Sequence, residues 1–355
     1  MPIPSRNGQW SIEKASRWAK ATPWLIGCNY LPRTAINQLE CFQADTFDPD
    51  TIEQELSWAA GLGFNSLRVF LHDLLWQVEG REHLARLERF LGIAAGYGIG
   101  VMFVLFDSCW HPFPHYGLQP LGEPGVHNPG WVQSPSVAVL REPARFDALE
   151  SYVTGIVSHF RDDPRVQVWD IWNEPGNYNI NSYAPRDLGP EKMQVVLGPM
   201  EKAFAWARSA RPSQPLTSGI WTGDWSSYDA MNPLTRAQAE LSDVISFHCY
   251  NPADGMRGCI NALRPFGRPL LCTEYMARGT GSRFETILPL LKEQNVGAYN
   301  WGFVAGKSQT YYGWDSWQNP CPSEPLLWFH DILRPDGQPY SQQEVACIRK
   351  LTGRE

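Results

Sequence analysis

The stretch Val166-Gln-Val-Trp-Asp-Ile-Trp-Asn173 is almost continuously apolar and runs directly into Glu174-Pro175. Such a run predicts a strand that is buried on both faces, as the strands of parallel sheets are. Pro175 ends the strand, because proline has no N–H for the ladder. A buried carboxylate is costly unless it is paired or hydrogen-bonded, so the position of Glu174 needs an explanation.

A second segment has the same form. Pro269-Leu-Leu-Cys-Thr-Glu274-Tyr275 is also an apolar run with a carboxylate near its carboxyl end. Two such strand ends suggest that Glu174 and Glu274 face one pocket. Paired carboxylates in a pocket are the groups that cleave glycosidic bonds.

Strand-like and helix-like runs alternate along the whole chain. Asp48-Pro49, for example, is a helix N-cap followed by proline at the first helical position. Strands are expected at 24–31, 66–72, 100–107, 166–173, 215–221, 243–250, 270–275 and 297–304. Helices are expected at 48–61, 84–94, 143–160, 190–209, 284–293 and 341–351, with shorter ones after the fifth and sixth strands.

Eight β-then-α units predict a single (β/α)8 barrel domain over residues 1–355. An open doubly wound sheet is the alternative, but no G-x-G-x-x-G follows a strand. Long connections follow the third, fourth and eighth strands. In a barrel the active site lies on that face.

Composition excludes several classes of protein. The formal net charge is -7 and no run of Lys or Arg is present, so a nucleic acid partner is not expected. No apolar stretch long enough for a membrane span occurs. The eight cysteines have no C-x-x-C spacing and are expected to be reduced, and neither a metal nor a cofactor is expected. Residues 1–8 have no signal-peptide core, which indicates a cytoplasmic protein or one whose leader has been removed.

Polar groups inside the strands point to a site. Arg68 lies within an apolar strand and must find an anion, and a carboxylate beside it would have its pKa lowered. His248 and Tyr250 are two residues apart and share one face. Trp301 ends the eighth strand and offers a flat apolar face with one N–H donor. Asp170 is expected to be a buried structural acid.

These residues in this order resemble the clan A glycoside hydrolases, and most closely family 5, the cellulase-like enzymes. The resemblance covers essentially the whole barrel. It rests on Arg68, Asn173, Glu174, His248, Tyr250, Glu274 and Trp301.

The resemblance implies a retaining mechanism in which Glu174 is the acid/base and Glu274 the nucleophile. It implies that Asn173 holds the 2-hydroxyl of the sugar and that Trp301 stacks under the ring. It further implies that Arg68 and Tyr250 keep Glu274 ionised and that His248 contacts the substrate or Glu174. Retention requires carboxyl groups about 5–5.5 Å apart.

The chain departs from the family at the third strand, where a His-Asn pair is often found. Here the sequence is Phe106-Asp107-Ser108-Cys109-Trp110-His111, so the histidine is displaced into the loop. Aromatic and histidine side chains of the long loops either form sugar subsites or pack the loops onto the barrel. They are Trp110, His111, His127, Trp131, Tyr178, Trp314 and Trp317.

The expected substrate is a β-linked oligosaccharide or glycoside, and the walls that long loops would form favour chain ends or short oligosaccharides. Two alternatives remain. A transglycosylase would use the same residues with an acceptor sugar in place of water, and a non-catalytic barrel would only bind carbohydrate. Sugar identity and oligomeric state are not indicated by the sequence.

Overall fold

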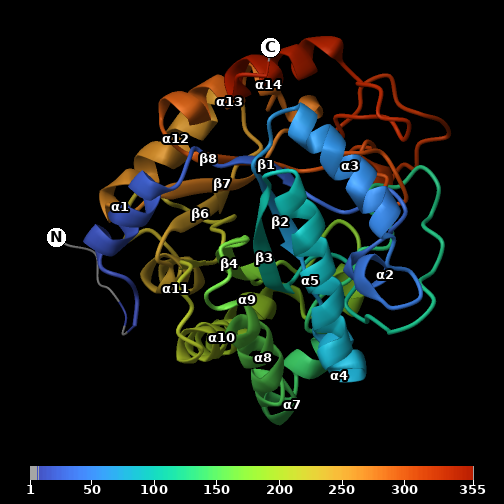
Figure 1. Cartoon of the computed structure of the whole chain (residues 1–355). Helices are drawn as coiled ribbons and strands as arrows, with labels where there is room; N and C mark the ends of the chain where they lie inside the picture. The colour runs from blue at the N-terminus through green and yellow to red at the C-terminus, as the bar shows by residue number, and fades with distance from the viewer. Residues whose placement is uncertain (1–5, 7, 355) are drawn as a thin grey trace.

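The computed structural model describes residue 6 and residues 8–354. Residues 1–5 and 7, which belong to the segment considered for a leader, lie outside the described residues, as does residue 355. Eight parallel strands occupy the centre of the molecule (Figure 1). They are β1 Ile26–Asn29, β2 Ser66–Phe70, β3 Gly100–Asp107, β4 Val166–Asn173, β5 Leu216–Thr217, β6 Ile245–His248, β7 Leu270–Tyr275 and β8 Gly297–Asn300.

The strands form one sheet in the order β5-β4-β3-β2-β1-β8-β7-β6. Its two edges meet at a parallel bridge between Ile220 and Phe247. There the N–H of Ile220 donates to the carbonyl of Ser246 at 2.9 Å. The sheet therefore closes on itself, and the predicted (β/α)8 barrel is confirmed.

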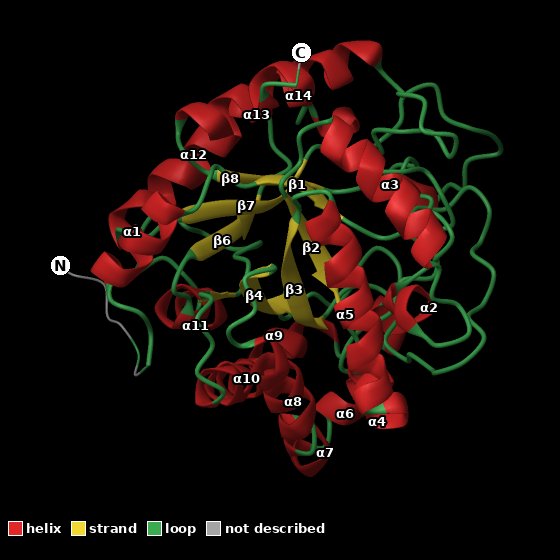
Figure 2. Ribbon diagram, viewed as in Figure 1, coloured by secondary structure: helices red, strands yellow, loops and turns green. Residues whose placement is uncertain are grey.

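Helices surround the strands (Figure 2). The helix α3 begins at Pro49 as predicted, and the Asp48 side chain caps it by accepting from the N–H of Thr51. The α-helices are α1 Ile12–Ala21, α2 Gln38–Phe42, α3 Pro49–Gly61, α4 Asp73–Glu79, α5 Arg81–Gly96, α6 Val137–Leu140, α7 Pro143–Asp147, α8 Glu150–Phe160, α9 Lys192–Val195, α10 Leu197–Ser209, α11 Pro233–Leu241, α12 Ala253–Leu263, α13 Phe284–Glu293 and α14 Gln342–Thr352. Within the described part of the chain, no helix has both the length and the apolar character needed to cross a membrane.

Long connections follow β3, β4 and β8, as predicted. A fourth long connection, residues 218–232, was not predicted, because the strand expected at 215–221 is only two residues long. The ladder ends there because the N–H of Ser218 donates to the Ser242 hydroxyl instead of to a neighbouring strand. Trp221 and the residues that follow it up to Ser226 then line the mouth of the barrel.

Candidate active site

Glu174 directly follows the last residue of β4 and has a left-handed backbone conformation, with φ of 42°. A residue with a side chain seldom adopts this conformation, and strain of this kind is concentrated at functional sites. The turn is closed by the N–H of Asn177, which donates to the carbonyl of Glu174 at 3.0 Å. The chain thereby turns the carboxyl group into the barrel mouth instead of out along the strand.

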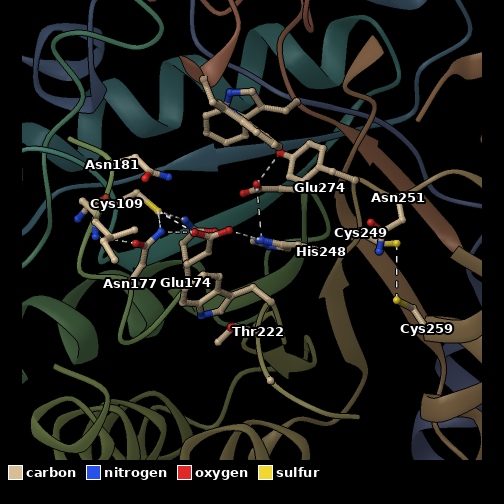
Figure 3. A pocket seen from close by; sticks show the side chains of 18 of the residues that line it. Cys109, Glu174, Asn177, Asn181, Thr222, His248, Cys249, Asn251, Cys259 and Glu274 are labelled. Carbon is tan, nitrogen blue, oxygen red and sulfur yellow. Dashed lines mark hydrogen bonds and ion pairs between the residues drawn. The ribbon is translucent and has the colours of Figure 1, made fainter. Parts of the chain in front are cut away.

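Glu274 lies within β7, opposite His248 of β6. The ladder between the two strands shifts register between Phe247 and His248, which brings the imidazole level with the carboxyl group. A carboxylate oxygen of Glu174, a ring nitrogen of His248 and a carboxylate oxygen of Glu274 all lie within 4.8 Å of one another. Figure 3 shows the two carboxyl groups meeting at the imidazole.

Arg68 lies beneath this pair and has no exposed surface. Its Nη1 donates to Glu274 Oε1 at 2.9 Å, while Nε and Nη2 donate to Asp170 Oδ2 at 2.9 and 2.8 Å. Nη2 also donates to Asn173 Oδ1 at 2.6 Å. Asp170 is therefore the buried, paired acid that the sequence predicts. Arg68 contacts the carboxyl group of Glu274 but does not line the cavity above it.

The surroundings of the two carboxyl groups differ. Glu174 Oε2 accepts from Asn177 Nδ2 at 2.7 Å and from Cys109 Sγ at 3.2 Å, and its Oε1 lies 2.9 Å from His248 Nδ1. Glu274 instead receives the Arg68 guanidinium on Oε1 and the Tyr250 hydroxyl on Oε2 at 2.8 Å. One carboxyl group has a cation at 2.9 Å, and the other has neutral partners.

Burial raises the pKa of Glu174, and the hydrogen bonds from Asn177 and Cys109 oppose this effect. Burial also raises the pKa of Glu274, and the charge of Glu174 adds to the rise, whereas His248, Arg68 and Tyr250 oppose it. Burial lowers the pKa of His248 to about 4, so its imidazole is neutral at neutral pH. The charge of one carboxyl group this close disfavours ionisation of the other, so the two groups titrate as a pair.

A cavity of about 960 Å³ opens above the pair. Its walls come from the connections after β3, β4, β5, β6 and β8. Asn173, Glu174, His248, Tyr250 and Glu274 line it together with many loop side chains. The aromatic residues and the histidine among them are Trp110, His127, Tyr178, Trp221, Trp225, Trp301, Trp314 and Trp317.

Two expected loop residues lie outside the cavity lining. The His111 ring packs edge-on against Tyr183, with ring centroids 5.0 Å apart, because its backbone is bridged to Val132. Trp131 is 3% exposed, and its indole N–H donates to Asp107 Oδ2 at 2.6 Å. Trp131 therefore supports Trp301, which it meets edge-on at 5.5 Å. We assign no sugar contact to either His111 or Trp131.

Sequence reasoning missed two partners of Glu174. The sequence marks Cys109 only through the departure from the family pattern, and it gives no reason to single out Asn177. Asp107 lies beside Asn173 in the β3–β4 ladder, so Cys109, two residues after Asp107, reaches the end of β4. The barrel order alone could have indicated Cys109. Asn177 depends on the conformation of the turn, for which the sequence gives no signal.

Glu174, His248 and Glu274 also have the residue types and spacing that could hold a metal ion, and they form the one such group among the described residues. The loop histidines His111, His115 and His127 join no group of this kind in the described part of the chain.

The fold and the site together define a closed (β/α)8 barrel with a carboxyl pair at the carboxyl-terminal mouth of its strands. No protein-family model and no curated protein sequence matches the chain. Solved structures with this fold include an exo-β-1,4-mannosidase from Opitutaceae bacterium strain TAV5, with a TM-score of 0.60 and 18% identity. The alignment covers 94% of this chain but 60% of that one, so this chain spans less than two thirds of the mannosidase.

Two further structures are similar. A GH5_18 protein from Streptomyces cattleya, in complex with GlcNAc, has a TM-score of 0.60 and 14% identity over 93% of this chain and 80% of that one. An endo-1,4-β-D-mannanase from Thermotoga petrophila RKU-1 has a TM-score of 0.58 and 15% identity over 93% and 99% of the two chains. At this identity the likeness shows the fold. It is the fold that the resemblance to family 5 implies.

Proposed function

We propose that the protein is a retaining glycoside hydrolase that cleaves a β-glycosidic bond in an oligosaccharide or glycoside. The observation that carries the proposal is the pair Glu174 and Glu274, with carboxylate oxygens within 4.8 Å of each other and different partners. Retaining enzymes hold their two carboxyl groups at about 5–5.5 Å, whereas inverting enzymes separate them by about 6.5–9.5 Å. The close approach supports retention.

The assignment of roles follows from the partners. Glu274 bonds to Arg68, which stays protonated, and to the Tyr250 hydroxyl, whose pKa burial raises well above its usual value. Both partners donate, so Glu274 is the ionised member of the pair and the nucleophile. Glu174, with a half-buried side chain, a raised pKa and neutral partners, holds the proton and is the acid/base.

In the first step Glu174 gives its proton to the leaving oxygen while Glu274 attacks the anomeric carbon, which produces a covalent glycosyl-enzyme. In the second step Glu174 takes a proton from water, and that water releases the sugar from Glu274. A water molecule activated by the same group that protonated the aglycone arrives on the face that the aglycone left. The configuration at the anomeric carbon is therefore retained.

Other side chains support binding. Asn173 lies at the floor of the cavity between Arg68 and Asp107, where its amide is fixed by hydrogen bonds of 2.6 and 2.9 Å. We assign it to a sugar hydroxyl beside the reacting carbon. We assign Trp301 to stack against the same sugar, and Trp110, Tyr178 and Trp314, which also line the cavity, to contact further sugars or the aglycone.

The walls around the cavity favour chain ends and short oligosaccharides over the middle of a long polymer. Because similar folds include β-1,4-mannosidase and β-1,4-mannanase proteins, β-mannosides are the first substrates to examine. Glucosides and xylosides follow, since the pair itself does not select the sugar.

The test is a panel of aryl β-glycosides run beside β-mannan, β-glucan and xylan. Glu174→Ala and Glu274→Ala are each expected to lose about a hundred- to ten-thousand-fold in kcat/KM on whichever substrate wild type cleaves. Glu53→Ala, at an exposed helical position, is the matched control and should retain wild-type activity. Full activity of both cavity variants would overturn the proposal.

The same panel separates the rivals. Products that carry an added sugar, with little free sugar, would identify a transglycosylase. Binding of a glycan without turnover would identify a carbohydrate-binding barrel.

A further inference from the structure

Two cysteines lie together on the cavity wall away from Glu174. Cys249 follows the end of β6, and Cys259 lies on α12. Their sulfur atoms are 3.6 Å apart, with the Cys259 thiol donating to Cys249 Sγ (Figure 3). Both residues line the cavity, where Cys249 is 4% exposed and Cys259 is half-buried.

The two thiols have unequal chemistry. The hydrogen bond from Cys259 lowers the pKa of Cys249, and hydrogen bonds from Asn251 add to this effect, while burial opposes it. The same contact raises the pKa of Cys259, and burial adds to that rise. The thiolate is the nucleophile of thiol chemistry, so Cys249 is the attacking sulfur and Cys259 the resolving one.

The other cavity-lining cysteine does not share these properties. Cys109 lies against Glu174, and burial together with the charge of that carboxyl raises the pKa of its thiol well above the usual value. Cys28, Cys41 and Cys272 are buried and do not line the cavity. The reactive arrangement is therefore specific to Cys249 and Cys259 among the residues around the cavity.

We propose that Cys249 and Cys259 form a redox-active dithiol site that small-molecule disulfides of the glutathione class oxidise. The Cys249 thiolate attacks one sulfur of the disulfide, forms a mixed disulfide and expels one thiolate. Cys259 then loses its proton to solvent and attacks Cys249 Sγ, which forms the internal disulfide and expels the second thiolate. The protein dithiol is oxidised by two electrons, and the small disulfide is reduced to two thiols.

Oxidation would act on the candidate active site through β6. Cys249 stands between His248, which lies 2.9 Å from Glu174, and Tyr250, which bonds to Glu274 at 2.8 Å. Its N–H also donates to the Glu274 carbonyl at 2.9 Å. A disulfide requires sulfur atoms about 2.05 Å apart, so the two side chains must rotate, or the end of β6 or α12 must shift, to bring the sulfur atoms together from 3.6 Å. This part of the inference rests on the proposed function, and we expect oxidation to lower kcat/KM by about tenfold or more.

The experiment treats the reduced full-length protein with excess oxidised glutathione, blocks the remaining thiols and measures intact mass and linked peptides. Wild type should take up two fewer blocking groups than untreated protein, yield a Cys249–Cys259 linked peptide and take up the full number again when dithiothreitol is added before blocking. Cys259→Ser should stop at a single glutathione adduct on Cys249. Cys321→Ser, which changes a half-buried cysteine outside the cavity lining, is the matched control and should behave as wild type.

The contrary outcomes are distinct. Wild-type protein that stays fully reduced, or that carries glutathione without the linked peptide, would overturn the dithiol site without any reference to a variant. A linked peptide with unchanged glycoside cleavage would overturn the coupling to β6. Absence of cleavage in both redox states would count against the proposed function and leave the mass result standing.

Discussion

Arg68 and Glu274 form an ion pair inside the barrel, with 2.9 Å between Nη1 and Oε1, and the guanidinium has no exposed surface. The same guanidinium pairs with Asp170, whose side chain is also fully buried. The Arg68 guanidinium therefore pairs with one acid in the barrel interior, Asp170, and with one at the barrel mouth, Glu274. Because Arg68 does not line the cavity, it acts on the chemistry through the charge and position of Glu274.

Replacement of Arg68 by Lys should show whether Arg68 positions Glu274 or binds the substrate. Lysine keeps the charge but lacks the planar fork that reaches Asp170, Asn173 and Glu274 together. We expect kcat on the best aryl glycoside to fall by about a hundredfold with a small change in KM. Arg278→Lys, which loosens another buried pair, with Glu344, is the control and should leave kcat unchanged. A rise in KM alone for Arg68→Lys would instead indicate a substrate contact.

Removal of the hydrogen bonds to Glu174 should move one limb of the pH profile. The bonds from Asn177 and Cys109 lower the pKa of Glu174, so their loss raises it. Glu174 must carry its proton to act as an acid, and activity is lost as pH rises through its pKa. Asn177→Ala and Cys109→Ala should therefore shift the alkaline limb of kcat/KM to higher pH. Asn181→Ala, an exposed cavity residue, should leave the limb in place, and a downward shift in the first two variants would refute the roles.

Removal of metal ions tests whether Glu174, His248 and Glu274 bind a metal instead of acting directly on the substrate. In the proposed mechanism Glu174 is the acid/base, Glu274 is the nucleophile and His248 contacts Glu174, and no metal takes part. Dialysis against a chelator should therefore leave kcat and KM unchanged. Loss of activity that added zinc restores would show that the group binds a metal, because zinc takes imidazole and carboxylate ligands.

The barrel was predictable because continuous apolar runs indicate strands that are buried on both faces. The runs that end at Asn173 and Tyr275 coincide with β4 and β7, since strands covered on both faces need no polar alternation. The carboxyl pair followed from the place of each glutamate at its strand end. The loops were less predictable. The sequence does not distinguish His111 and Trp131 from Trp110 and Trp314, since all four are aromatic loop residues. The path of the backbone keeps His111 out of the cavity lining, and the hydrogen bond to Asp107 keeps Trp131 out of it.

Polar partners that meet through a turn were also not predictable from the sequence. Asn177 meets Glu174 because a left-handed residue bends the chain, and Cys259 meets Cys249 because α12 packs beside β6. In both cases residues three to ten positions apart meet through a turn whose geometry depends on the rest of the fold.

His83 provides a stability prediction that is independent of the activity. It is fully buried on α5, neither ring nitrogen has a hydrogen-bond partner, and burial lowers its pKa to about 3. The unfolded chain binds this proton below about pH 6.5 and the folded chain does not until about pH 3, so stability is lost as pH falls through that window. His83→Leu removes the titration and the unpaired nitrogens, and should raise the free energy of unfolding by about 1–2 kcal/mol at pH 7. At pH 5 the gain over wild type should be about 2 kcal/mol larger. Denaturant unfolding at both pH values measures this, with His115→Leu at an exposed position as control. An equal gain at the two pH values would show that His83 is not held neutral by burial.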